Sequence, residues 1–186
     1  MIGTNACGHQ AFIGWLTLYL REVDRVSQSA VAMTLSAQYL GSIIGCFAWG
    51  FVVDHWGRRA GSIWLLAAGL FAAVFVLLPG PLLAKQAAAF GFGLSFAAVA
   101  AIGPWLAELY PAALRAPATS IFQWGRFISL IAPPATGFAA ASLGLPVVMG
   151  LAAVAFIVSG MIWRALPETH HYAWVNTVPH PKRSGR

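Results

Sequence analysis

Long hydrophobic runs separated by short polar breaks dominate the chain. The breaks fall at charged residues and at Gly/Pro clusters. Each run is about 19 to 24 residues long, enough for a helix rising about 1.5 Å per residue to cross a hydrocarbon core of roughly 30 Å. The predicted spans are residues 2–20, 30–53, 60–78, 86–106, 119–141 and 145–163. The pattern therefore predicts an all-α membrane protein with six transmembrane helices.

The same pattern predicts one domain and a tail. Residues 1–165 hold all the predicted spans, and residues 166–186 are richer in proline and in charged and polar residues. We expect a six-helix transmembrane domain over 1–165 and a cytoplasmic tail over 166–186.

The positions of Lys and Arg predict the orientation. Of the 11 Lys and Arg residues, seven lie on one side of the predicted spans and three on the other, and Arg126 falls inside a span. Connections rich in positive charge usually face the cytoplasm. We therefore expect both termini in the cytoplasm of a plasma membrane, the inner membrane in a bacterium. Met1 stands almost directly before the first predicted span. The alternative that the chain is a fragment lacking its upstream part therefore stays open.

Composition excludes a water-soluble fold. Of 186 residues, 59% are hydrophobic and 9% are charged, against about 25% charged in soluble domains. The net charge of +6 does not indicate a nucleic-acid binder, because the basic residues punctuate apolar runs and do not cluster on a polar face. The two cysteines lie in apolar stretches, which predicts neither a disulfide framework nor a zinc site.

Motifs for covalent chemistry are missing from the sequence. It contains no Gly-x-Ser-x-Gly, no His-Glu-x-x-His, no phosphate-binding Gly-Lys-Ser/Thr and no pair of carboxylates inside a span. We expect a protein that is not an enzyme and that holds no cofactor and no metal.

The connection between the second and third predicted spans carries a distinctive motif. It reads Gly50-Phe-Val-Val-Asp54-His-Trp-Gly57-Arg58-Arg59, so that a helix ends near a carboxylate, turns at a glycine and exposes two arginines. This spacing resembles the signature loop of the major facilitator superfamily, which follows the second helix of each six-helix half.

Further segments resemble the same superfamily, in the order of its C-terminal half. Residues 103–115, Gly-Pro-Trp-Leu-Ala-Glu-Leu-Tyr-Pro-Ala-Ala-Leu-Arg, are similar to the segment after the tenth helix of sugar porters and of aromatic-acid and metabolite proton symporters. Residues 15–20, 125–126 and 167–169 resemble features near the seventh, eleventh and twelfth helices. The resemblance implies helices seven to twelve of a secondary transporter, a half that contains inverted repeats of three helices.

The resemblance also implies a cytoplasmic gate. Its residues would be Asp54, Arg58, Arg59, Glu108 and Arg115. Carboxylates and guanidiniums at one membrane face form charge-assisted bonds that must break when the helices beside them separate. The alternative is that the arginines only set the topology.

Arg126 lies about 12 Å inside its predicted span, close to the middle of the bilayer. A charge at that depth is costly unless it faces water or a partner, so it indicates the substrate pathway and an anionic substrate. The alternative is that it extends toward the cytoplasmic headgroups. The candidates for the pathway are Arg126, Gln123, Gln38, Tyr39, Trp105 and Trp124. Each of the uncharged ones has helix packing as its alternative, and His9 is either a proton relay or a packing residue.

Together these features predict one half of a secondary transporter that moves a small solute, an organic anion with protons, by alternating access. Its partners would be the solute, protons, the lipid bilayer and a missing N-terminal half or a second copy. No Asp or Glu lies within a predicted span, so a titrating carboxylate would lie elsewhere. The alternatives are a truncated, non-transporting remnant or interaction protein, and a facilitator of sugars or other metabolites.

Overall fold

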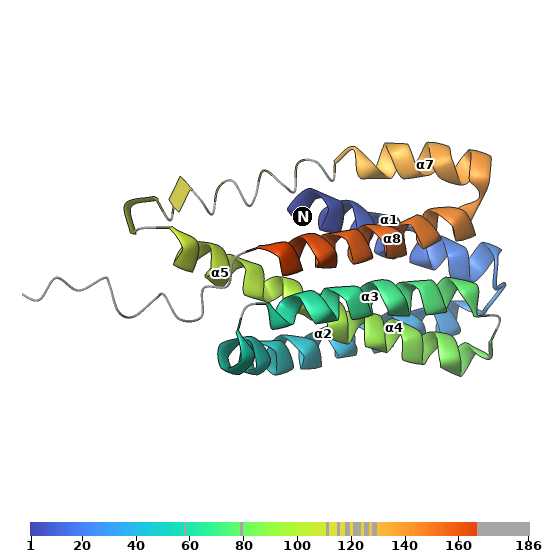
Figure 1. Cartoon of the computed structure of the whole chain (residues 1–186). Coiled ribbons are helices and arrows are strands. Elements are labelled where there is room, and N and C mark those ends of the chain that lie inside the picture. The colour runs from blue at the N-terminus through green and yellow to red at the C-terminus, as the bar shows by residue number, and fades with distance from the viewer. Residues whose placement is uncertain are drawn as a thin grey trace, which may run out of the picture.

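The computed structural model describes residues 1–57, 59–78, 80–110, 112–114, 116–117, 120, 124, 127 and 130–166, without the side chains of residues 106–109 and 112. Helices make up the regular structure of these residues (Figure 1). The α-helices are α1 (Ile2–Glu22), α2 (Gln28–Trp56), α3 (Ala60–Leu77), α4 (Leu82–Phe96), α5 (Ile102–Leu109), α7 (Ala132–Leu143) and α8 (Leu145–Ala165). Two short 3₁₀ helices are η1 (Ala97–Ala101) and η2 (Ala112–Leu114). The all-α prediction is confirmed.

Among the described residues, four stretches are long and apolar enough to cross a membrane. They are Gln28–Trp56, Ala60–Leu77, Leu82–Trp105 and Leu145–Ala165. α1 has 21 residues but carries Asn5, His9 and Gln10, and α7 has only 12 residues in the described part of the chain. Six spans and their bounds therefore stay predictions, while apolar helices able to span a membrane are established.

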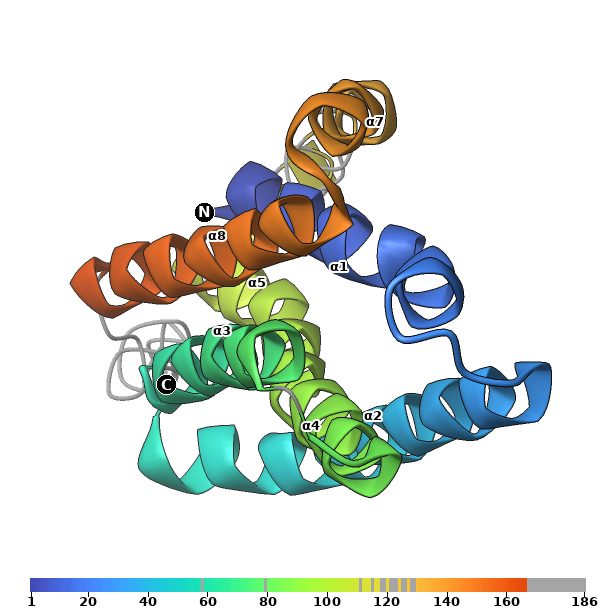
Figure 2. The same cartoon turned by 90° about the vertical axis from the view of Figure 1, so that its right-hand side faces the viewer.

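The long helices lie roughly along a common direction (Figure 1). α8 packs between α1 and α3, and α4 packs between α3 and α2. Seen along this direction, α7 lies beyond α1 and α8, on the side away from α2 (Figure 2). An aromatic cluster fills the middle: Phe12 of α1 meets Phe75 of α3 at 5.6 Å and Phe92 of α4 at 4.3 Å between ring centroids.

Glycines seat α3 against α8. A Cβ placed at Gly61 would lie 2.6 Å from the Trp163 ring, and one at Gly160 would lie 2.9 Å from the Leu66 side chain. Only glycine leaves room for such contacts. The early part of α3 thus meets the late part of α8, so the two helices run antiparallel, and Arg59 Nε donates to the carbonyl of Leu166 at 3.3 Å.

Glycines also bring α2 and α4 into backbone contact. A Cβ at Gly93 would overlap the carbonyl oxygen of Gln38, and Cβ atoms at Gly41 and Gly45 would overlap carbonyl oxygens of α4. Small residues allow this approach in membrane helices, where packing and interhelical hydrogen bonds replace the hydrophobic effect as the driving force. The Trp49 indole N–H adds such a bond, donating to the carbonyl of Leu94 at 3.0 Å.

An ion pair joins the helices at the end opposite to the Arg59–Leu166 bond. Lys85 Nζ pairs with Asp24 Oδ2, and their side chains are only 10% and 16% exposed. The ammonium also lies 5.1 Å from the Tyr19 ring centroid and 5.7 Å from that of Phe75, within cation–π range. The pair therefore ties the α1–α2 connection to α3 and α4.

Replacing Gly93 with alanine tests the α2–α4 contact. The added methyl group has no space beside the Gln38 carbonyl, so we expect the free energy of unfolding to fall by about 1 to 3 kcal/mol. Denaturant unfolding in detergent, followed by circular dichroism, measures the change. Gly50→Ala is the matched control on α2, because no atom lies within 4 Å of a Cβ there. Equal stability of the two variants would contradict the close approach.

Candidate functional site

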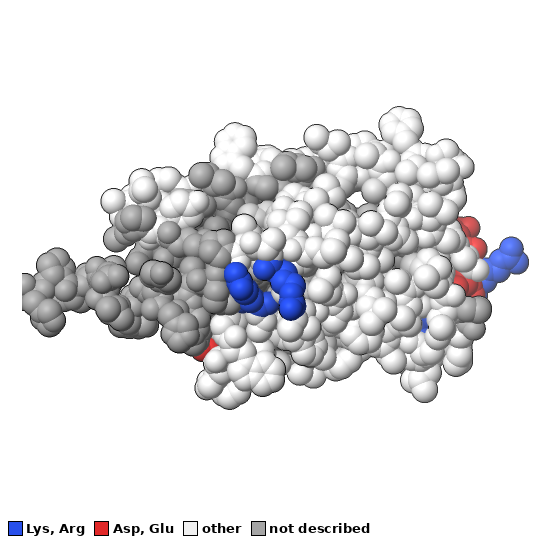
Figure 3. Space-filling view, in the orientation of Figure 1, with Lys and Arg blue, Asp and Glu red and all other residues white. Residues whose placement is uncertain are grey.

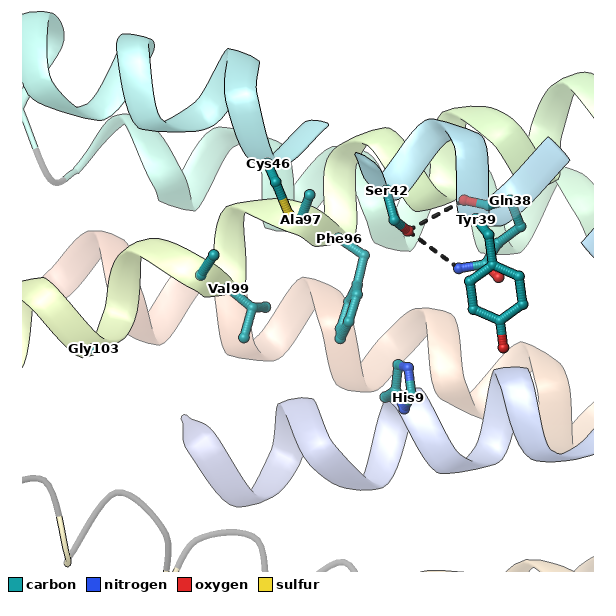
Figure 4. Close-up of a pocket in the computed structure, with 10 residues that line it drawn as sticks. His9, Gln38, Tyr39, Ser42, Cys46, Phe96, Ala97, Val99 and Gly103 are labelled. Carbon is teal, nitrogen blue, oxygen red and sulfur yellow. Dashed lines mark hydrogen bonds between the residues drawn. The ribbon is translucent and has the colours of Figure 1, made fainter. Parts of the chain in front are cut away.

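A cavity of about 460 Å³ opens between α1, α2 and the segment from α4 to α5 (Figure 4). Its lining residues are His9, Gln38, Tyr39, Ser42, Cys46, Phe96, Ala97, Val99, Ala100 and Gly103. The volume falls within the roughly 300 to 1,000 Å³ typical of small-molecule sites. Tyr39 and Cys46 on its wall are exposed, so the cavity is open at the surface of the chain.

A polar stripe on α2 forms one wall. Gln38, Ser42 and Cys46 follow one another at intervals of four residues, so they lie on one face of the helix. The contact of α2 with α4 places this face at the cavity, beside the small side chains of Ala97 and Ala100. The cavity thus combines polar groups with apolar walls.

The Gln38 amide is held in a defined orientation. Ser42 Oγ donates to the Gln38 carbonyl at 3.1 Å, which occupies the only hydroxyl proton. The side-chain contact at 3.3 Å must therefore have Gln38 Nε2 as its donor and Ser42 Oγ as its acceptor. These two bonds involve Nε2 and the backbone carbonyl and leave Oε1 unused. Gln38 is 3% exposed, and its Oε1 has no hydrogen-bond partner among the described residues. A buried acceptor in that state costs about 1 to 3 kcal/mol.

His9 faces this stripe from α1 (Figure 4). Its imidazole stacks on the Phe96 ring with 4.6 Å between centroids. Phe96 is itself held by Phe92 at 5.7 Å and by Phe156 of α8 at 5.9 Å. The aromatic wall is therefore anchored in the core, and it holds the imidazole at the edge of the cavity.

The helix behind the cavity changes its geometry. α4 ends at Phe96, the five residues of η1 follow, and α5 begins at Ile102. Pro104 has no N–H to give to the carbonyl of Ala100, so a regular α-helix cannot continue unbroken through this point. A 3₁₀ stretch inside a longer helix is a common response to such strain and often marks a functional site.

The predicted pathway residues separate into three groups. Gln38 and Tyr39 come together in the cavity. Trp105 is buried and stacks on Trp163 of α8 at 5.7 Å, outside the cavity lining, while Trp124 is exposed and lies 5.3 Å from Phe127. The last group is Arg126 and Gln123, which lie outside the described residues. The pathway roles of this last group and of the two tryptophans stay predictions.

The predicted gate is described only in part. Asp54 lies exposed near the end of α2, and Arg59 lies directly before α3, where it contacts Leu166. Glu108 belongs to α5, but its side chain is not described, and the remaining two arginines, Arg58 and Arg115, are outside the described residues. The gate as a network stays a prediction.

Several lining residues were not singled out from the sequence. Ser42 and Cys46 continue the face of Gln38 at helical spacing, a signal that periodicity could have revealed. Phe96 and Val99 carried no such signal, because apolar residues in a span are ordinarily packing residues. Phe96 is the last residue of α4 and Val99 lies in η1, so both flank the change in helix geometry.

Comparison with known sequences places the chain in a transporter family. The family model described as Major Facilitator Superfamily matches residues 1–184. A probable 4-methylmuconolactone transporter of Cupriavidus pinatubonensis is 31% identical over 184 residues, which cover 95% of this chain and 42% of the relative. The chain thus spans less than half the length of this relative.

Solved structures show the same fold. The inward-open xylose transporter XylE of E. coli matches with a TM-score of 0.73 and 19% identity, over 90% of this chain and 46% of XylE. The proton:xylose symporter XylE bound to 6-bromo-6-deoxy-D-glucose matches with a TM-score of 0.71 and 18% identity, over 90% of this chain and 43% of XylE. At 18% to 19% identity, the likeness to these structures shows a shared fold alone.

Proposed function

The chain belongs to the major facilitator superfamily, a family of transporters and not of enzymes, and from this premise we propose that it forms one six-helix half of a secondary transporter. Its match to 46% of XylE supports the half. A membrane-integral protein follows from the family and from the apolar helices. The excess of Lys and Arg on one side supports a plasma membrane, the bacterial inner membrane, with both termini in the cytoplasm.

The cavity is the proposed wall of the transport pathway. It combines an apolar surface with a few convergent polar groups, the usual build of a small-molecule site. The Gln38 amide is the observation that carries this proposal: it lines the cavity, and its buried Oε1, unpaired among the described residues, would gain a hydrogen bond if the amide turned toward a solute. A second six-helix half, from another chain or from a second copy, would close the pathway from the other side.

The proposed gate lies at the cytoplasmic end. Asp54, Arg58, Arg59, Glu108 and Arg115 would hold this end closed while the pathway is open to the outside. The contact of Arg59 with Leu166 supports it, since it joins the start of α3 to the end of α8 at this face. A single exposed ion pair contributes about 0 to 1 kcal/mol, so the gate would need the whole network.

Two substrate classes compete. Arg126, placed by the sequence near the middle of a span, favours an organic anion carried together with protons. The described lining favours a second candidate, a neutral solute with hydroxyl groups, because it offers an amide, a hydroxyl, a phenol and an imidazole but no Lys or Arg. The family relationship alone is compatible with both.

Uptake into proteoliposomes tests both classes. The chain would be reconstituted alone and with an N-terminal half, and given radiolabelled carboxylates and sugars with and without a proton gradient. We expect gradient-driven uptake of a carboxylate, abolished by Arg126→Ala. Uptake of a neutral solute that survives Arg126→Ala would favour the second class. If neither preparation takes up any solute, the chain is a non-transporting remnant and the proposal fails.

Replacing Gln38 with leucine tests the cavity itself. The variant keeps the volume but removes the amide, so we expect the apparent affinity for the transported solute to fall about tenfold. Initial uptake rates over a range of solute concentrations measure it.

Thr34→Val is the matched control for Gln38→Leu. Thr34 is also buried on α2, one turn earlier, but its hydroxyl bonds to Ala30 within the helix and does not line the cavity. We expect unchanged affinity in this control. An equal loss in both variants would assign Gln38 to helix stability and not to solute binding.

A further inference from the structure

A second hollow lies at the end of the molecule where α3 begins and α8 ends. Its volume is about 360 Å³, and its lining residues are Trp56, Arg59, Ala60, Ile63 and Arg164. Figure 3 shows Lys and Arg side chains gathered in one patch near the ends of these helices, with a wide uncharged surface beside it. The hollow is separate from the cavity between α1, α2 and α4.

The antiparallel packing of α3 and α8 creates the positive charge of this hollow. Arg59 stands directly before α3, and Arg164 lies in the last turn of α8. The seating of Gly61 against Trp163 brings these helix ends together. None of the described residues that line the hollow is acidic. Two guanidiniums, which present N–H donors in planar forks, suit the oxygens of a phosphate diester, although the Nε–H of Arg59 already donates to Leu166.

The surroundings of the hollow are those of a membrane interface. Trp56 is 80% exposed, and exposed tryptophans collect at the level of the lipid headgroups. Ile63, which also lines the hollow, is 54% exposed and begins a stripe that continues with Leu70 and Leu77 at intervals of seven residues. The 14 intervals from Ile63 to Leu77 span about 21 Å at 1.5 Å per residue. The stripe is therefore longer than one leaflet of the hydrocarbon core, about 15 Å.

From this arrangement we propose that the hollow binds the headgroup of an anionic phospholipid, with its phosphate between Arg59 and Arg164 and an acyl chain along the Ile63–Leu70–Leu77 stripe. Basic hollows between membrane helices on the cytoplasmic side are suited to such headgroups. The apolar stripe distinguishes a lipid from a free phosphate, which would gain nothing from it. The bound lipid would join the start of α3 to the end of α8.

Native mass spectrometry of the full chain in detergent tests this site. The chain would be titrated with phosphatidylglycerol and, separately, with phosphatidylcholine. We expect tighter binding of phosphatidylglycerol, and a loss of about fivefold in that affinity for each arginine replaced by glutamine. The double variant Arg59→Gln/Arg164→Gln should bind the two lipids equally, and Arg59→Lys/Arg164→Lys should keep part of the preference.

The matched control removes two arginines from the other end of the molecule. Arg21→Gln/Arg25→Gln makes the same change in charge, in the last turn of α1 and in the connection that follows it, and should leave the preference for phosphatidylglycerol intact. Circular dichroism checks that each variant is folded. If Arg59→Gln/Arg164→Gln is unfolded, the comparison uses Arg59→Lys/Arg164→Lys and the single variant Arg164→Gln instead. An equal loss in the control would mean that only net charge matters, and would overturn the site.

Two further outcomes would also overturn the proposal. One is equal binding of both lipids by the unchanged chain. The other is displacement of phosphatidylglycerol by millimolar inorganic phosphate, which would make the hollow a site for a soluble anion. None of these results depends on transport, so the lipid site and the proposed transport function stand or fall separately.

Discussion

The backbone contact between α2 and α4 is the constraint on which the candidate site depends. Gly41, Gly45 and Gly93 remove the side chains that would hold the two helices apart, and the Trp49 indole bonds across the interface. This contact sets the polar face of α2 beside the η1 break of the α4–α5 segment. Without it, Gln38 would still lie on a helix, but it would have no apolar wall opposite and no cavity to face.

The remaining contacts hold the helix ends. At one end the Asp24–Lys85 pair ties the α1–α2 connection to α4, and at the other the Arg59–Leu166 bond joins the start of α3 to the end of α8. Buried ion pairs often contribute specificity more than stability. A bundle fastened at both ends is suited to move as one body, which is what the proposed alternating access of one half against another requires.

The sequence predicted the helical class well, because long apolar runs leave few alternatives to membrane helices. The family could also be predicted from the sequence, since the characteristic residues of the Gly50–Arg59 loop lie in one short local motif. The cavity could be predicted only in part: Gln38 and Tyr39 were identified as polar residues within a span, but Phe96 has no feature in the sequence that distinguishes it from other apolar residues of a span. The partnership of Asp24 with Lys85 joins residues 61 positions apart, and nothing local in the sequence links them.

Transport through the proposed cavity requires that the Gln38, Ser42 and Cys46 face of α2 lines a water-filled pathway. Labelling Cys46 in membranes with a charged, membrane-impermeant maleimide, in a Cys7→Ala background, tests it directly. The comparison is Leu70→Cys in a chain without the native cysteines, on the exposed stripe of α3. We predict that Cys46 is labelled and position 70 is not, because thiols react as thiolates in water. Labelling of Cys46 only by an apolar reagent would place this face against lipid and contradict a water-filled pathway.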